Sequence, residues 1–168
     1  QCDLMLLAGD LFDSDNTWPE TIEALQRAFS ACHAKVFISP GNHDYYTPGC
    51  AYAVTQWPDN VHIFSSQTPT AVELPELGCV IWGAAFTQAT SPSLLEQFQI
   101  QDRGLANLMV LHGDALFPSS PYNPISTEQI AASGLTYLAL GHIHQCAMLQ
   151  PAGSTVYAWP GCPMGRGF

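Results

Sequence analysis

The sequence predicts an α/β protein in which short buried strands alternate with amphipathic helices. Apolar runs of four or five residues recur along the 168-residue chain, turn residues separate them, and helical patterns lie between several of them. The hydrophobic fraction of 47% is typical of a folded chain. The length suits one domain, so we expect residues 1–168 to form a single domain.

A buried strand at 4–8 and an amphipathic helix open this pattern. A capping box at 17–20 predicts the start of the helix, with Pro19 tolerated in its first turn. We expect the helix to end at about Ala31 and to bury one face, formed by Ile22, Leu25, Ala28 and Phe29.

The remaining predicted strands lie at 36–39, 61–64, 70–74, 79–84, 108–111, 137–140, 148–149 and 155–159. Turn residues separate the three runs between 61 and 84, which favours antiparallel pairing among them. A loop rich in Pro and Ser at 117–124 precedes a predicted helix over 126–132. The last two runs are expected to close a second sheet.

Composition and charge narrow the functional class. Fourteen acidic and four basic residues give a net charge of −10, which argues against a free-standing nucleic-acid binder, because phosphate contacts need clustered Lys and Arg. The same acidity is compatible with a metal enzyme, whose carboxylate ligands are neutralised by bound cations. No apolar run approaches the ~20 residues of a membrane helix, and no signal segment opens the chain. We therefore expect a cytoplasmic protein without a membrane partner.

Cysteine and aromatic residues add two expectations. The six cysteines form no Cys-x-x-Cys pair, which argues against a zinc ribbon and predicts reduced, mostly buried thiols. Tyr45 and Tyr46 directly follow a polar turn and are the candidates for substrate contact. Core packing, rather than stacking on bases, is expected for four aromatic residues in apolar runs: Trp57, Trp82, Tyr157 and Trp159.

Four polar clusters follow four of the predicted strands: Gly-Asp-Leu-Phe-Asp at 9–13, Gly-Asn-His-Asp at 41–44, His-Gly-Asp at 112–114 and Gly-His-Ile-His at 141–144. Ligands gather beyond the carboxyl ends of the strands in open α/β sheets, so we expect these side chains around one point. Each cluster alone has a plainer explanation, since an aspartate can close a turn and a histidine can be a satisfied core residue. Together, and in this order, the clusters predict a metal site.

The residue types in these clusters indicate the metal and its chemistry. Carboxylate, amide and imidazole donors without thiolate suit manganese, iron or zinc, with magnesium less suited to histidine. Two ions about 3.5–4 Å apart can stabilise both the attacking and the leaving oxygen at phosphorus. An imidazole such as that of His43 can donate a proton to a leaving alkoxide near neutral pH. The alternatives are a structural role for His43 and a loop hydrogen bond for Asp44.

This ordered set of motifs, from Asp10 to His144, resembles the calcineurin-like metallophosphoesterases. The resemblance implies a four-layer αββα sandwich with a dimetal site at the strand ends. It implies that Asp10 bridges two ions and that His144 serves one of them, while the other ion is completed by Asn42, His112 and His142.

The resemblance also assigns catalytic residues and exposes one departure from the family. His43 would be the catalytic histidine near the scissile phosphate, and Asp13 would orient it. The family begins with an Asp-x-His motif on an earlier strand, and this sequence has none before Leu4. Those residues would supply most of the shell on the His144 side, so we expect one tightly bound ion, a weak or absent second ion and slow hydrolysis. The uncapped closing segment also suggests truncation, so we expect both ends of the domain to be cut.

The branch of the family is suggested by three segments. Asp13 is followed by Ser14 and Asp15 rather than by Arg-Gly, which disfavours the protein phosphatases. The segments 9–13, 138–144 and 160–168 look like those of SbcD-type DNA repair exonucleases. This likeness implies cleavage of DNA phosphodiesters with manganese, a coiled-coil ATPase partner and homodimer formation. Because Lys and Arg are scarce, two other classes stay open: a small-molecule phosphodiesterase or phosphomonoesterase with a pocket shaped by the 117–124 loop, and an inactive metal-binding or partner-binding remnant.

Overall fold

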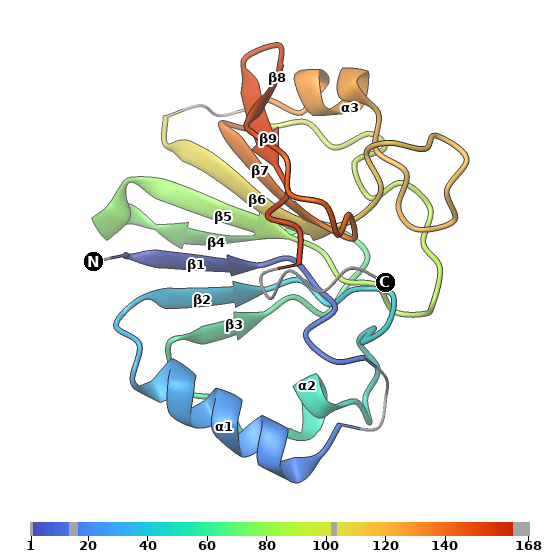
Figure 1. The fold of residues 1–168 in the computed structure, drawn as a ribbon. Helices are drawn as coiled ribbons and strands as arrows, with labels where there is room; N and C mark the ends of the chain where they lie inside the picture. The colour runs from blue at the N-terminus through green and yellow to red at the C-terminus, as the bar shows by residue number, and fades with distance from the viewer. Residues whose placement is uncertain (1, 14–16, 102–103, 163–168) are drawn as a thin grey trace.

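The computed structural model describes residues 2–13, 17–101 and 104–162, and it contains two β-sheets with helices outside them (Figure 1). Ser14, Asp15 and the closing residues 163–168, which contributed to the choice of family branch, lie outside the described residues. In chain order the elements are β1 (Leu4–Leu7), α1 (Pro19–Ser30), β2 (Lys35–Ile38), α2 (Ala51–Val54), β3 (Val61–Ile63), β4 (Thr70–Leu74), the 3-10 helix Pro75–Leu77, β5 (Cys79–Gly83), β6 (Ala106–His112), α3 (Thr127–Ala132), β7 (Tyr137–Gly141), β8 (Gln150–Ala152) and β9 (Thr155–Ala158).

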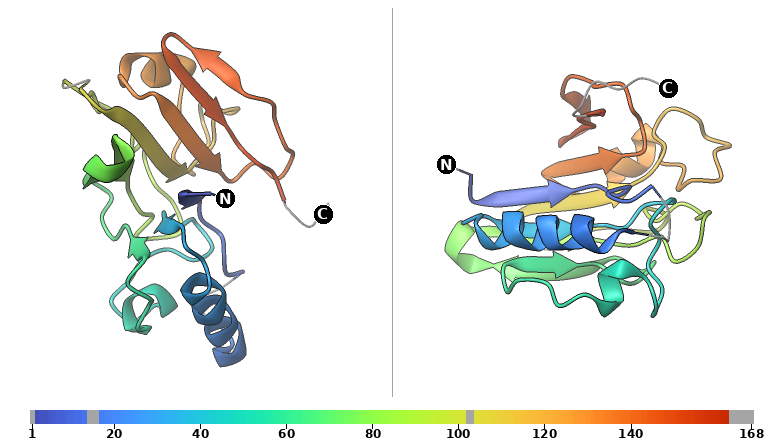
Figure 2. Two further views of the ribbon diagram at one scale, coloured as in Figure 1. Left: turned by 90° about the vertical axis from the view of Figure 1, so that its left-hand side faces the viewer. Right: turned by 60° about the horizontal axis from the view of Figure 1, so that its bottom comes forward.

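The two sheets pack face to face, and the helices cover their outer faces, as the two views of Figure 2 show. One apolar cluster lies between the sheets and joins Phe37 of β2 to Ile81 of β5. A second cluster, which includes Phe29 of α1 and Tyr52 of α2, covers the outer face of the small sheet. A third cluster covers the outer face of the large sheet and includes Ile130 of α3. The predicted α/β class is confirmed. Each apolar cluster lies between two neighbouring layers, so the order of layers is helices, small sheet, large sheet and helix.

Both sheets are mostly parallel. The small sheet has the order β1-β2-β3, and all of its pairs are parallel. The large sheet has the order β4-β5-β6-β7-β9-β8, in which only the outer pairs β4·β5 and β8·β9 are antiparallel. The carboxyl ends of β1, β2, β6 and β7 therefore lie at one end of the molecule, where the four polar motifs follow them (Figure 1).

The predicted antiparallel pairing among the three runs between 61 and 84 is half right. β4 pairs antiparallel with β5, as expected, but β3 pairs in parallel with β2, where Val61 lies opposite Val36. The reason lies just before β3, where the Asn60 side-chain amide donates to three carbonyls around the end of α1, those of Phe29, Cys32 and Ala34. These hydrogen bonds hold the start of β3 beside β2 rather than beside β4.

The two longer predicted helices differ in how they begin. The capping box predicted at 17–20 is wrong, because Trp18 occupies the N-cap and makes no side-chain cap. A residue before proline is driven to extended backbone, so Trp18, next to Pro19, becomes the last residue outside the helix. Ala28, expected on the buried face of α1, is exposed. By contrast, Ser126 caps α3 through a complete capping box.

The end of the described chain forms the last two strands of the large sheet. β8 begins at Gln150 because the tight turn at Gly153 sets its register against β9; the preceding Met148, predicted to be in a strand, is exposed. The four aromatic residues expected in the core pack against apolar clusters. The expectation of mostly buried thiols is wrong: all six cysteines are free, but only Cys79 is buried. Within the described ranges, no helix has both the length and the apolar character needed to cross a bilayer.

Candidate metal centre

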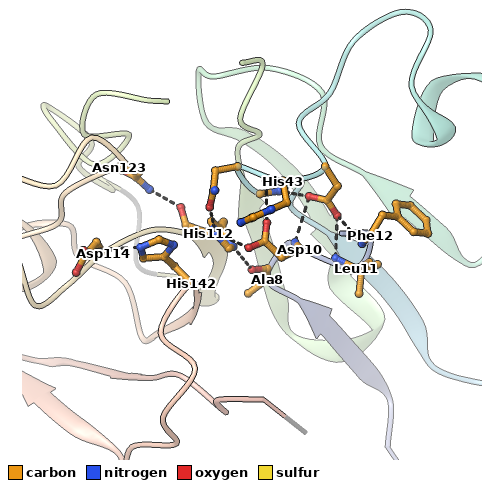
Figure 3. A network of polar contacts seen from close by, with 12 residues as sticks. Ala8, Asp10, Leu11, Phe12, His43, His112, Asp114, Asn123 and His142 are labelled. Atoms are coloured by element: carbon orange, nitrogen blue, oxygen red, sulfur yellow. Dashed lines mark hydrogen bonds and ion pairs between the residues drawn. The ribbon is translucent and has the colours of Figure 1, made fainter. Parts of the chain in front are cut away.

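The centre of the candidate site is the imidazole of His112 at the end of β6. Its side chain is fully buried, and its Nε2 atom lies 2.9 Å from the Asn42 amide oxygen and 3.3 Å from Asp10 Oδ2 (Figure 3). Asp10 follows β1 and Asn42 follows β2, so the three side chains come from both sheets. The four-layer sandwich implied by the family resemblance places the site at its strand ends, and here the strand ends of two facing sheets meet at His112.

The ring of His112 is oriented by its second nitrogen. Nδ1 lies 2.8 Å from the carbonyl oxygen of Ala8, which can only accept, so Nδ1 carries the proton. In the neutral ring Nε2 then has a lone pair, and it faces the oxygens of Asp10 and Asn42, which are also acceptors. Three acceptors facing one another repel unless a proton or a metal cation lies among them. This donor set of imidazole, carboxylate and amide fits a divalent metal ion.

His142, at the end of β7, extends the cluster. Its ring centroid lies 5.2 Å from that of His112, in an edge-on arrangement. Burial lowers the pKa of His142 and the nearby His112 lowers it further, while Asp114 and Asp10 act in the opposite direction. The lowered pKa favours the neutral imidazole, which is the form that binds metals. Among the described residues, no three His, Cys, Asp or Glu side chains could hold an ion on their own, so the fit depends on the Asn42 amide.

Unusual backbone conformations direct these side chains inward. Asp10 has a φ of 53° and His142 a φ of 80°, in the left-handed region that non-glycine residues avoid. Such residues cost about 1–3 kcal/mol each and are concentrated at functional sites. Gly41 and Gly141 let the strand ends approach closely, since a Cβ at Gly41 would collide with the Asp10 carboxylate and one at Gly141 with the Ala8 carbonyl.

The two motif loops of the small sheet are joined by the buried carboxylate of Asp44. Its Oδ1 accepts hydrogen bonds from the backbone amides of Gly41 and Asp10, at 2.7 and 3.1 Å. Its Oδ2 accepts from the amides of Leu11 and Phe12 and from the hydroxyl of Tyr52. The loop hydrogen bond considered for Asp44 is therefore observed, and Asp44 fixes the Asp10 loop against the loop that carries Asn42 and His43.

A second buried network supports the loop after β6. Asn123 is completely buried, and its side chain donates to the carbonyl of His112 and accepts from the amide of Leu94. Like Tyr52, Asn123 has no signal in the sequence that marks it as part of the site. Asp114 lies within the quoted His-Gly-Asp motif, and its buried position beside His142 was not predicted (Figure 3).

Comparison with known proteins identifies the family. The model of the family described as calcineurin-like phosphoesterase matches residues 1–146. The chain belongs to the calcineurin-like phosphoesterase family. It is 31% identical over 156 residues to a Bacillus subtilis (strain 168) protein named "Uncharacterized metallophosphoesterase YhaO", and the match covers 88% of this chain and 38% of that protein. A crystal structure with 12% sequence identity covers 84% of this chain and 63% of its own, with a TM-score of 0.49, and a likeness this low supports no further conclusion.

The converging donors of His112, Asp10 and Asn42 fit the divalent metals that members of the calcineurin-like phosphoesterase family generally bind. His144 follows β7, two residues beyond His142. It is exposed, and it lines a cavity of about 600 Å³ that Asp10 and His142 also line. Its carbonyl accepts a hydrogen bond from the amide of Cys162.

The remaining candidate residues lie on the loops of the small sheet. His43 is exposed, and its backbone amide donates to Asp10 Oδ1 at 3.1 Å. Asp13 is exposed on the loop after β1, and its pairing with His43 stays a prediction. Tyr46 packs against the cluster under the small sheet, while the half-buried Tyr45 lies nearer Asp44 and lines a small cavity with it. The substrate contacts of both tyrosines also stay predictions.

Proposed function

We propose that this chain hydrolyses phosphodiester bonds with a divalent metal ion held by Asp10, Asn42, His112 and His142. The observation that carries the proposal is the group formed by the His112 Nε2 lone pair and the oxygens of Asp10 and Asn42, a donor set suited to a divalent cation. The ion would supply Lewis-acid activation of the phosphate and of a water molecule. Manganese suits the mixed nitrogen and oxygen donors, with iron, zinc or magnesium as alternatives.

The chain's own residues would bind and protonate the substrate. The exposed imidazole of His43 stands next to Asp10 through its backbone hydrogen bond, so it can reach a phosphate placed at the metal ligands. There it would donate a proton to the leaving oxygen, with Asp13 orienting the ring. Asp44 would keep His43 in place, because it ties the His43 loop to the Asp10 loop.

For the substrate we propose DNA, cleaved as in SbcD-type repair exonucleases. The motifs at 9–13 and 138–144 support this branch. The scarcity of free positive charge argues against DNA binding by this chain alone. In the described part of the chain, the basic side chains of Arg27 and Lys35 each lie within 4 Å of a glutamate. We therefore propose that DNA affinity comes from a coiled-coil ATPase partner or from a homodimer.

A small-molecule phosphodiesterase or phosphomonoesterase is the second candidate, favoured by the loop after β6. The ring of Tyr122 packs on His142 with centroids 5.2 Å apart, and Phe117 on the same loop is 64% exposed. A compact substrate could contact such a loop while its phosphate lies at the metal. An inactive metal-binding remnant is the third candidate.

That third candidate is favoured by the free edge of β1. Among the described residues β1 pairs only with β2, so the backbone groups along its other edge make no ladder hydrogen bonds. The 600 Å³ cavity runs beside β1 and is lined on its other wall by residues of β7, including Ala139 and Leu140. We propose that a strand with the family's Asp-x-His pair occupies this groove in the whole protein and completes a second ion with His144. The chain alone would then bind one ion tightly and hydrolyse slowly.

One set of assays separates these candidates. The chain would be incubated with Mn²⁺ and single- or double-stranded DNA, and in parallel with bis-p-nitrophenyl phosphate, alongside metal stoichiometry by elemental analysis. His43→Ala should abolish turnover, whereas His33→Ala, which changes an exposed histidine in the loop after α1, should not. Cleavage of the small diester with DNA left intact would eliminate the nuclease proposal. Two tightly bound ions per chain would contradict the proposal that the chain alone holds only one ion tightly.

A further inference from the structure

The carboxylate of Asp114 occupies a position that no metal or catalytic role explains. Asp114 is 5% exposed, and its Oδ2 atom lies 3.8 Å from Nε2 of His142 (Figure 3). Its Oδ1 atom accepts hydrogen bonds from the amides of Leu116 and Phe117, at 2.9 and 3.1 Å. The backbone amide of Asp114 donates to the carbonyls of Tyr122 and Asn123, so the main chain of this residue is also fixed.

We infer that Asp114 is a positioning residue that selects the Nε2–H tautomer of His142, so that Nδ1 carries the lone pair offered to the metal. The inference rests on the proposed function, because it treats His142 as a metal ligand. A neutral imidazole has one N–H and one lone pair. With the proton on Nε2, the N–H faces the carboxylate; with the proton on Nδ1, the Nε2 lone pair faces carboxylate lone pairs, which is unfavourable in a buried site.

The two oxygens of Asp114 also join the metal ligand to the loop after β6. Oδ1 fixes the turn that carries the exposed Leu116 and Phe117, while Oδ2 faces His142. Tyr122, at the far end of the same loop, packs its ring on His142. A carboxylate beside the ring nitrogen that does not bind the metal orients a ligand histidine and makes its other nitrogen a stronger metal ligand. Asp114 thus makes the 114–122 loop and the His142 imidazole one structural unit.

The test is the tautomer of His142 in the metal-free protein, read from long-range ¹⁵N–¹H correlation spectra. We expect protonated Nε2 in the wild-type chain. In Asp114→Asn the two backbone amides retain the side-chain oxygen, so the new NH₂ group takes the place of Oδ2 and donates to Nε2. The proton of His142 should then move to Nδ1, and Mn²⁺ affinity should fall about 10- to 100-fold. Asp59→Asn removes the same charge from an exposed carboxylate and should change neither.

A wild-type spectrum with the proton on Nδ1 would overturn the inference without any variant, even if Asp114→Asn fails to fold. An unchanged tautomer in a folded Asp114→Asn protein would also overturn it. Failure of the proposed function has a different signature, since the wild-type chain would then bind no Mn²⁺ while its His142 tautomer was as expected.

Discussion

Removing the carboxylate of Asp44 should remove the hydrogen bonds that join the loop of Asp10 to the loop of Asn42. Asp44→Ala leaves four backbone amides and the Tyr52 hydroxyl without their acceptor. A hydrogen bond to a charged group contributes about 1.5–3 kcal/mol, but these five share one carboxylate and do not add. We expect the loss of the whole buried network to lower the free energy of unfolding by about 3–5 kcal/mol. Tyr52→Phe removes a single donor and should cost about 1.5–3 kcal/mol.

Urea denaturation followed by circular dichroism would measure these losses, with Asp59→Ala as a control on an exposed carboxylate that should stay within about 0.5 kcal/mol of wild type. Adding Tyr52→Phe to Asp44→Ala should cost little more, because the hydroxyl has already lost its partner. A loss below about 1 kcal/mol for Asp44→Ala, or full additivity in the double variant, would refute the reasoning. Burial, and then the charge of Asp44, raises the pKa of Tyr52 well above its ordinary 10.0. The stabilisation from this pKa shift is therefore complete below about pH 10 and is lost only as the pH rises through the raised pKa.

Two further predictions concern packing and pH. Gly141→Ala would drive a methyl group into the Ala8 carbonyl, so the melting temperature should fall by the equivalent of about 1–3 kcal/mol, whereas Gly49→Ala, with no atom near its added Cβ, should change it little. Burial lowers the pKa of His62 from its ordinary 6.5. The unfolded chain therefore binds the proton first, and the contribution of His62 to stability, complete above about pH 6.5, is lost as the pH falls toward the lowered pKa. His62→Gln should be less acid-sensitive than wild type in urea titrations between pH 8 and 5, and equal sensitivity would contradict the assigned shift.

The strands and motif positions could be predicted because their signals are local. The apolar runs before the four motifs are short and end in glycine-containing polar turns, and each of the four became a parallel strand ending at the site. The partner of β3 could not be read in this way, because it depends on Asn60 contacting carbonyls 26 to 31 residues earlier in the chain. The prediction of the start of α1 was wrong for a local reason, because the constraint of Pro19 on the backbone of Trp18 outweighed the capping box.

The proposed metal ligands could be predicted from local motifs in the sequence, whereas the residues that support them could not. Asp10, Asn42, His112 and His142 are marked by their motifs, and the two-sheet sandwich that gathers them was implied by the family resemblance. Asp44 acts on amides 32 to 34 residues away, and its partner Tyr52 stands outside every motif. The buried amide of Asn123 holds the carbonyl of His112 from an otherwise unremarkable loop. Such supporting contacts depend on the fold and leave no spacing pattern in the sequence.

The most direct test of the metal centre is a crystal of this chain soaked in Mn²⁺, with diffraction recorded at the manganese absorption edge. We expect one strong anomalous peak within coordination distance of His112 Nε2, an Asp10 carboxylate oxygen and the Asn42 amide oxygen, with His142 turned toward it. A map with no peak among these atoms, or with the peak at another place on the chain, would contradict the account.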